Sequence, residues 1–111
     1  MDCLFCKIVA REISADIVFE NDACLAFRDL NPQAPTHILI VPKKHVDGLA
    51  SVSADDDLQS LLLAASEIAR QEGIDRLGYR VVINSGQQAG QTVLHLHVHL
   101  LGGRALEWPP G

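Results

Sequence analysis

The chain has 111 residues, of which 48% are hydrophobic and 21% are charged. This size and balance are typical of one soluble globular domain, so we expect a single domain over residues 1–111. The formal net charge of -5 argues against a nucleic-acid-binding surface, and no apolar run approaches the roughly 20 residues of a membrane span. No basic leader precedes a long apolar stretch at the N-terminus, which predicts a cytoplasmic location.

The first elements in chain order are a short helix and three strands. Residues 3–12 favour the helix, and the apolar runs 16–20 and 24–30 predict two antiparallel strands joined by a short turn. Two prolines break the chain within 31–35. The β-branched run 36–42 then predicts a third, central strand.

A longer helix is predicted between Ser53, a common N-cap residue, and Gly73, a common helix terminator. Its apolar stripe comprises Leu58, Leu61, Leu62, Ala65, Ile68 and Ala69. Two more strands, at 79–85 and 93–101, flank a loop rich in glycine and glutamine. The sum is an α+β domain of about five antiparallel strands with one long and one short helix.

Cysteine usage does not indicate a disulfide framework, because three cysteines cannot all pair within one chain. Cys3 and Cys6 have the Cys-x-x-Cys spacing, which occurs both in metal sites and in redox pairs. Cys24 lies in the apolar stretch "ACLAF" and is expected to be a small buried hydrophobic residue.

Three of the five histidines occupy alternate positions in "HLHVHLL". Side chains alternate faces along a strand, so His95, His97 and His99 should line one face while the intervening apolar residues enter the core. Three interpretations follow: hydrogen-bonded structural histidines, zinc ligands, or a row that binds a phosphate and attacks it through a neutral imidazole. The preceding loop favours the last.

That loop, "GQQAGQT", lacks the lysine and the spacing of a phosphate-binding P-loop and leads into a strand, so an ATPase is excluded. The backbone N–H groups of Gly90 and Gln91 and the hydroxyl of Thr92 can still serve phosphate oxygens. Imidazoles and loop donors together suit a single α-phosphate.

The motif "HLHVHLL" matches the histidine triad, and the chain resembles the Hint branch of the histidine triad (HIT) superfamily. The likeness extends over residues 6–45 and 78–104 to the ending "WPPG", and "LGGR" after the triad favours Hint over the Fhit branch. It implies a HIT-like fold, a single HIT domain over 1–111, and a homodimer in which Trp108 lies near the partner's active site.

The resemblance also implies hydrolysis of purine nucleoside phosphoramidates to the monophosphate, with no catalytic cofactor. His97 would be the nucleophile that forms a covalent nucleotidyl intermediate, supported by His99, Thr92 and His37. The nucleotide-binding set would be Asp29 at the ribose, Asn84, Gly90, Gln91, Thr92, His97 and His99 at the phosphate, and Phe5, Phe27, Leu30 and Leu39 around the purine.

The same resemblance implies a structural zinc ion held by Cys3, Cys6, His45 and His95, a closed site of two thiolates and two imidazoles. Other functions stay open from the sequence. They are a dinucleoside polyphosphate hydrolase, a nucleotide-binding regulatory module, and a hydrolase whose triad binds a catalytic metal.

Overall fold

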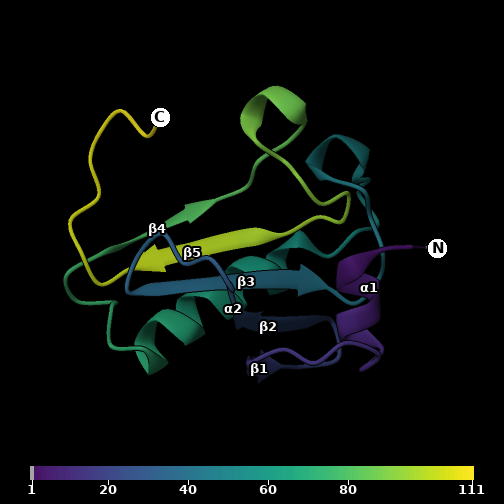
Figure 1. The fold of residues 1–111 in the computed structure, drawn as a ribbon, viewed down its shortest axis with the longest axis horizontal. Coiled ribbons are helices and arrows are strands. Elements are labelled where there is room, and N and C mark those ends of the chain that lie inside the picture. Colours follow the sequence, from purple (N-terminus) through teal and green to yellow (C-terminus); the bar gives the residue numbers. More distant parts are fainter. Residues whose placement is uncertain (1) are drawn as a thin grey trace.

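The computed structural model describes residues 2–111 and contains one five-stranded antiparallel sheet with the strand order β1-β2-β3-β5-β4 (Figure 1). The described elements are α1 (Leu4–Val9), β1 (Ile17–Glu20), β2 (Cys24–Arg28), β3 (Thr36–Pro42), a 3-10 turn η1 (Leu49–Ser51), α2 (Leu58–Gln71), β4 (Tyr79–Val82), a second 3-10 turn η2 (Gln87–Ala89) and β5 (Val98–Gly102). The predicted α+β class and the antiparallel sheet are confirmed.

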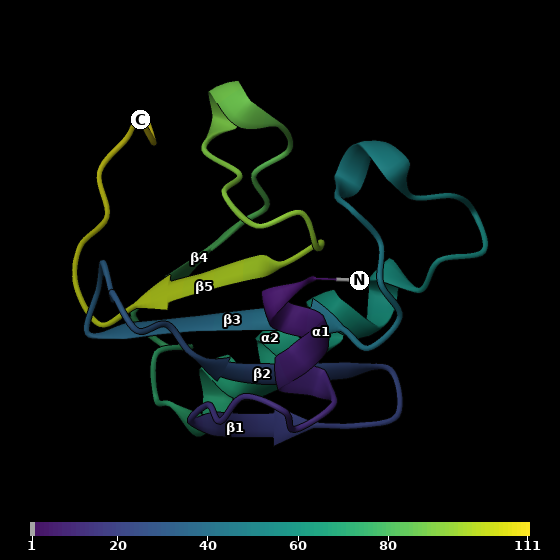
Figure 2. The ribbon, with the colours of Figure 1, turned by 45° about the vertical axis from the view of Figure 1, so that its right-hand side comes forward.

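The two helices cover opposite faces of the sheet, α1 in front of it and α2 behind it (Figure 2). Alternate residues of the central strand β3 serve the two layers: Ile38 and Ile40 pack with α2, whereas Leu39 and Val41 pack with α1. Cys24 is fully buried in the α2 layer, as expected. Because α1 is short, it covers only part of its face and leaves room beside it.

The long helix begins later than predicted. Asp57, not Ser53, is its N-cap, and the Asp57 side chain accepts a hydrogen bond from the backbone N–H of Ser60. Ser53 instead forms a separate turn in which its backbone N–H donates to Asp56. Ser53 and Asp57 are both residue types that commonly cap a helix N-terminus. Asp56 also forms an ion pair with Lys44 Nζ.

The apolar stripe of α2 is also rotated slightly from the prediction. Its buried residues are Leu61, Ala64, Ala65, Ile68 and Ala69, while Leu62 is 51% exposed. Gly73 follows the helix with a φ of 74°, which confirms the predicted end.

The strand predicted at 93–101 is shorter and begins only at Val98. The reason is that the residues before Val98 are not paired with β3. The backbone N–H of Leu96 donates to the carbonyl of Val46, which lies in the loop after β3, rather than to a strand. Only His99 of the three histidines therefore lies in a regular strand. The strands predicted at 24–30 and 79–85 likewise end early, at Arg28 and Val82.

In the described part of the chain, no helix has both the length and the apolar character that a membrane crossing requires.

Candidate functional site

A pocket of about 280 Å³ opens on the sheet face that α1 only partly covers. It brings together most of the residues predicted to bind a nucleotide. Those that line it are Phe5, Phe27, Asp29, Leu30, Leu39, Thr92, His97 and His99. One end of the pocket is apolar, and the other carries imidazoles and a carboxylate.

The apolar end is made by aromatic side chains from two elements. Phe5 of α1 is 4% exposed and meets Phe27 of β2 edge to face at 5.5 Å between ring centroids. Phe5 also lies edge to face against the His97 ring at 5.1 Å. Leu30, in contrast, is 99% exposed and forms the rim. A flat apolar slot therefore lies directly beside the histidines.

His97 is held with one ring nitrogen available. Its Nδ1–H donates to the carbonyl of His95, two residues earlier in the chain, at 2.7 Å. A neutral imidazole that donates through Nδ1 carries its lone pair on Nε2. Nε2 has no hydrogen-bond partner among the described residues, and the ring lines the pocket. His97 therefore presents a nucleophilic nitrogen to whatever occupies the pocket.

His37 and His99 form a hydrogen-bond relay. The surrounding contacts determine which ring nitrogen of each histidine carries the proton. The backbone N–H of Gln33 donates to His37 Nδ1 at 3.0 Å, so a neutral His37 carries its proton on Nε2. That Nε2–H donates to His99 Nδ1 at 2.9 Å. The remaining proton of His99 is consequently on Nε2, a buried atom without a partner in the described residues.

This unpaired Nε2–H of His99 is the most informative atom of the site. A buried donor without an acceptor costs on the order of 1 to 3 kcal/mol, so its retention points to a ligand acceptor. Burial, together with the nearby His97 and His37, lowers the pKa of His99 to about 4. The ring is thus a neutral donor near pH 7, suited to a phosphoryl oxygen.

Asp29 follows β2 and closes the same corner. Its Oδ2 lies 3.5 Å from His37 Nε2, and its Oδ1 accepts the backbone N–H of Asn31. Asp29, His37 and His99 are close enough to suggest a metal site. However, a metal on His37 Nε2 would require a proton on Nδ1, which already accepts the Gln33 N–H. We therefore assign these three residues to a hydrogen-bond relay.

The glycine-rich loop lies beside the pocket and enters it only in part. The backbone N–H groups of Gly90 and Gln91 donate within their own turn, to Gln87 and Gly86, and neither residue lines the pocket. The Gln91 side chain also serves the loop, since it donates to the carbonyls of Asp47 and Val93. Asn84 lines a neighbouring cavity with His99. Of the loop residues predicted at the phosphate, the pocket contains Thr92 alone.

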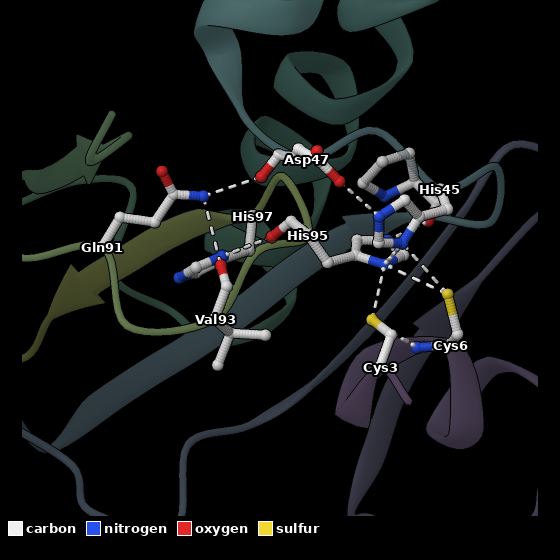
Figure 3. Close-up of polar contacts among 9 residues, drawn as sticks. Cys3, Cys6, His45, Asp47, Gln91, Val93, His95 and His97 are labelled. Atoms are coloured by element: carbon white, nitrogen blue, oxygen red, sulfur yellow. Dashed lines mark hydrogen bonds and ion pairs between the residues drawn. The ribbon is translucent and has the colours of Figure 1, made fainter. Parts of the chain in front are cut away.

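The second predicted cluster, Cys3, Cys6, His45 and His95, is assembled at the N-terminus of α1 (Figure 3). All four ligand atoms lie within 4.8 Å of one another. His95 Nδ1 is 3.4 Å from Cys3 Sγ and 3.1 Å from His45 Nδ1, which is in turn 3.2 Å from Cys6 Sγ. Zinc bonds of about 2.3 Å to sulfur and about 2.0 Å to nitrogen place tetrahedral ligand atoms about 3.3 to 3.8 Å apart.

The contacts outside this cluster direct the correct nitrogens inward. His95 Nε2–H donates to the Pro42 carbonyl at 2.9 Å, and His45 Nε2–H donates to Asp47 Oδ1 at 2.7 Å. Both Nδ1 atoms are therefore unprotonated and face the two sulfurs. Such outer contacts are characteristic of histidines that bind zinc. The residues present fit a closed structural zinc site.

His95 connects the two clusters. Its side chain belongs to the cysteine cluster, and its carbonyl accepts the Nδ1–H of His97. Phe5, between Cys3 and Cys6 in α1, lies against both His95 and His97. A metal at the cysteine cluster would therefore also restrain His97 and the apolar slot.

Sequence reasoning missed several contributors. Gln33 sets the tautomer of His37 through its backbone, which no side-chain pattern reveals. Asp47 orients His45. The sequence signal that could have identified Asp47 is a carboxylate two residues after a predicted ligand histidine. Ile13 and Ala15 line the pocket from an irregular loop, where no hydrophobic periodicity exists to identify them.

The partly buried, neutral His99 predicts a pH-dependent stability. Its pKa of about 4 lies below the ordinary histidine value of 6.5, so the unfolded chain binds the proton more tightly and acid favours unfolding. Between pH 7 and pH 5 the free energy of unfolding should fall by about 2 kcal/mol from this residue. Urea unfolding at both pH values measures the fall. Burial also lowers the pKa values of His37 and His95, so these two residues add to the fall in the free energy of unfolding. In the comparison variant His99→Gln, only the contribution of His99 to this fall should be lost.

The fold and site define a class of protein with a row of histidines beside an apolar pocket. The HIT domain family model matches residues 10–106. A HIT-like protein of Synechococcus elongatus is 57% identical over 99% of this chain and 97% of that protein, and a 14 kDa zinc-binding protein of Zea mays is 51% identical over 97% and 87%. The chain belongs to the HIT domain family.

Solved structures agree with this assignment. A HIT family hydrolase from Legionella pneumophila superposes with a TM-score of 0.97 at 52% identity, covering 99% of this chain and 100% of that one. The sheet order and the positions of both helices are therefore those of a HIT-family hydrolase fold.

Proposed function

We propose that this protein hydrolyses purine nucleoside 5'-phosphoramidates to the nucleoside monophosphate, as the likeness to the Hint branch implies. The observation that carries the proposal is the pair of His97 and His99, which both line the pocket. Among the described residues, His97 offers an unpartnered Nε2 lone pair and His99 a buried Nε2–H without an acceptor. A phosphoryl group bound between them would meet a nucleophile and a hydrogen-bond donor together.

The reaction has two steps. His97 Nε2 attacks the α-phosphorus, the P–N bond breaks, and the amine departs with the electron pair and takes a proton from solvent by way of the Thr92 hydroxyl. Water then attacks the nucleotidyl-histidine, and the P–N bond to His97 breaks so that its electron pair returns to Nε2. The water proton goes to solvent. His99 stays neutral and donates to a phosphoryl oxygen in both steps.

The rest of the pocket accounts for nucleoside binding. Phe5, Phe27 and Leu39 supply an apolar slot of aromatic and aliphatic surfaces for a purine, with Leu30 at the rim. Asp29 lines the same pocket, and its carboxylate can accept from ribose hydroxyls.

We further propose one structural zinc ion on Cys3, Cys6, His45 and His95, a fit supported by the ligand spacing and by the zinc-binding maize relative. The ion would hold α1 against the sheet and takes no part in the chemical steps. The protein would act in the cytoplasm as a homodimer, with neither nucleic acid nor membrane as partner. Exposed apolar residues on β4 and in the tail, Tyr79, Val81 and Trp108, support the dimer.

A substrate comparison tests the proposed activity. Adenosine 5'-phosphoramidate should be hydrolysed with a kcat/KM at least about 100-fold above that for diadenosine polyphosphates, because Arg28, the one lysine or arginine among the described lining residues, is already paired with Glu72 and so is not free for additional phosphates. Ion chromatography of AMP release measures both rates, and 100-fold corresponds to about 3 kcal/mol. Faster cleavage of the dinucleotide would instead assign a polyphosphate hydrolase, and nucleotide binding without turnover a regulatory module.

A further inference from the structure

Thr92 carries the hydroxyl through which the proposed reaction passes a proton to the departing amine. The residue is exposed, lines the nucleoside pocket, and lies in irregular chain between η2 and β5. Threonine is branched at Cβ, so its χ1 is restricted and the direction of the hydroxyl follows the backbone. Since no helix or strand fixes that backbone, other contacts must position Thr92.

The side chain of Gln91 ties the residue before Thr92 to the residue after it. Gln91 Nε2 donates to the carbonyl of Val93 at 3.1 Å, which closes a short ring across Thr92 (Figure 3). Val93 is partly buried and packs against the apolar cluster that lies between α1 and the sheet. The chain on both sides of Thr92 is therefore anchored.

The same amide attaches this ring to two further segments. Gln91 Nε2 also donates to the carbonyl of Asp47 at 2.8 Å, and Oε1 accepts the backbone N–H of Gly86 at 2.9 Å (Figure 3). Both N–H groups and the oxygen of the amide are thus used. Asp47 is itself held, because its carboxylate accepts from His45 Nε2. One side chain connects the start of the glycine-rich loop, its end and the segment after β3.

The neighbouring Gly48 leaves just enough room for this amide. A Cβ atom at Gly48 would lie 3.0 Å from Gln91 Nε2 and 3.1 Å from Gln91 Oε1. The φ of Gly48 is -179°, an extended conformation that any residue can adopt, so the backbone itself does not require glycine. The structure therefore uses a small residue at position 48 to accommodate the Gln91 side chain.

The chemistry of the leaving group makes the position of Thr92 important. An amine is a poor leaving group unless its nitrogen gains a proton as the P–N bond breaks. The donor must then lie within hydrogen-bond reach of that nitrogen, and a displacement of 1 Å can cost about 100-fold in rate. Contacts that hold the backbone at Thr92 consequently affect the rate of this step.

We propose that Gln91 is a positioning residue whose side chain holds Thr92 in place for proton transfer to the departing amine. This inference rests on the proposed function and adds a residue role to it. As the P–N bond breaks, the nitrogen keeps the electron pair and takes the hydroxyl proton of Thr92, and the hydroxyl oxygen regains a proton from solvent. The Gln91 side chain acts through Thr92 and takes no part in bond formation or cleavage.

Two substrates that differ in the leaving group test this role. Adenosine 5'-phosphoramidate releases an amine that needs a proton, whereas the p-nitrophenyl ester of AMP releases p-nitrophenolate, a stable anion that needs none. In Gln91→Ala, kcat/KM should fall about 10-fold or more for the phosphoramidate and less than about 2-fold for the ester. Both values report the steps up to the nucleotidyl-histidine, so the later attack by water does not affect the comparison.

Two further variants test the same role independently. In Gly48→Ala the added methyl group crowds the amide and leaves Gln91 and Thr92 unchanged, so the phosphoramidate-to-ester ratio of kcat/KM should also fall. Thr92→Val removes the hydroxyl and keeps the shape. Adding Gln91→Ala to Thr92→Val should lower phosphoramidate turnover little further, because both changes act on one proton transfer.

Gln88→Ala is the matched control. Gln88 is an exposed glutamine of the same loop and is not among the residues that line the pocket, so its loss should leave the ratio unchanged.

The outcomes separate this inference from the proposed function. Equal losses for the two substrates in Gln91→Ala would indicate a general structural role and overturn the inference, as would additive losses in the double variant. If Gln91→Ala does not fold, an unchanged ratio in Gly48→Ala overturns it. Failure of the unaltered protein to hydrolyse the phosphoramidate would instead overturn the proposed function, and the inference with it.

Discussion

Replacing His97 with alanine should reduce phosphoramidate hydrolysis by at least about 1,000-fold, because covalent catalysis is lost with its nucleophile. The reason lies in one hydrogen bond: the His95 carbonyl fixes the proton on Nδ1 and leaves the Nε2 lone pair toward the pocket. In the unaltered protein, acid quenching during turnover should trap one nucleotidyl group. Mass spectrometry of peptides should locate it on His97.

His97→Gln serves as the companion variant, since an amide of similar size should keep the fold and the nucleotide affinity while remaining inactive. His99→Gln differs in kind: it retains a hydrogen-bond donor, so partial activity and a trapped adduct are expected. Undiminished turnover in His97→Ala, or an adduct on another residue, would show that the covalent mechanism is wrong.

The second large effect is expected at the cysteine cluster. Protein purified without added metal should contain about one zinc per chain, and the double variant Cys3→Ser/Cys6→Ser should contain almost none. At free zinc a thousandfold above Kd, binding contributes about 4 kcal/mol to the free energy of unfolding. The double variant should therefore unfold at markedly lower urea concentration, and plasma mass spectrometry measures the metal.

Cys24→Ala is the matched control, because Cys24 is the remaining cysteine and lies on the α2 side of the sheet, away from the cluster. It should keep its zinc. Turnover should also fall in the double variant, since His95 and Phe5 connect the cluster to His97. Full zinc content after loss of both thiols would contradict the proposed ligands.

Much of the fold was accessible from local patterns. The apolar runs predicted all five strands, and the stripe of α2 was correct in Leu61, Ala65, Ile68 and Ala69. The prediction was wrong where two neighbouring segments both have a helix-capping pattern, and where a tertiary hydrogen bond replaces the hydrogen bonds between two strands. Asp57 caps α2 in place of Ser53, and Leu96 bonds to Val46 instead of continuing β5 toward its N-terminus.

The site shows the same division. The clusters at Cys3 and at His97 were predicted from residue types, spacing and family resemblance, and the structure brings their members together. The phosphate contacts of Gly90 and Gln91 stay predictions, and in the structure their N–H groups donate inside the turn. Backbone donors carry no sequence signature, so their availability emerges only after folding.

By itself, the sequence determined that three histidines would alternate with apolar residues and so share one side of the chain, since a side chain reverses face at every extended residue. Only the tertiary structure decided that these histidines are chemically unequal. The carbonyl of Pro42 turns His95 Nδ1 toward the sulfurs, and the carbonyl of His95 leaves Nε2 of His97 unprotonated. The hydrogen bond from His37 places the proton of His99 on Nε2, which has no partner among the described residues. Tautomers depend on neighbours that are distant in the chain, and folding alone brings those neighbours together.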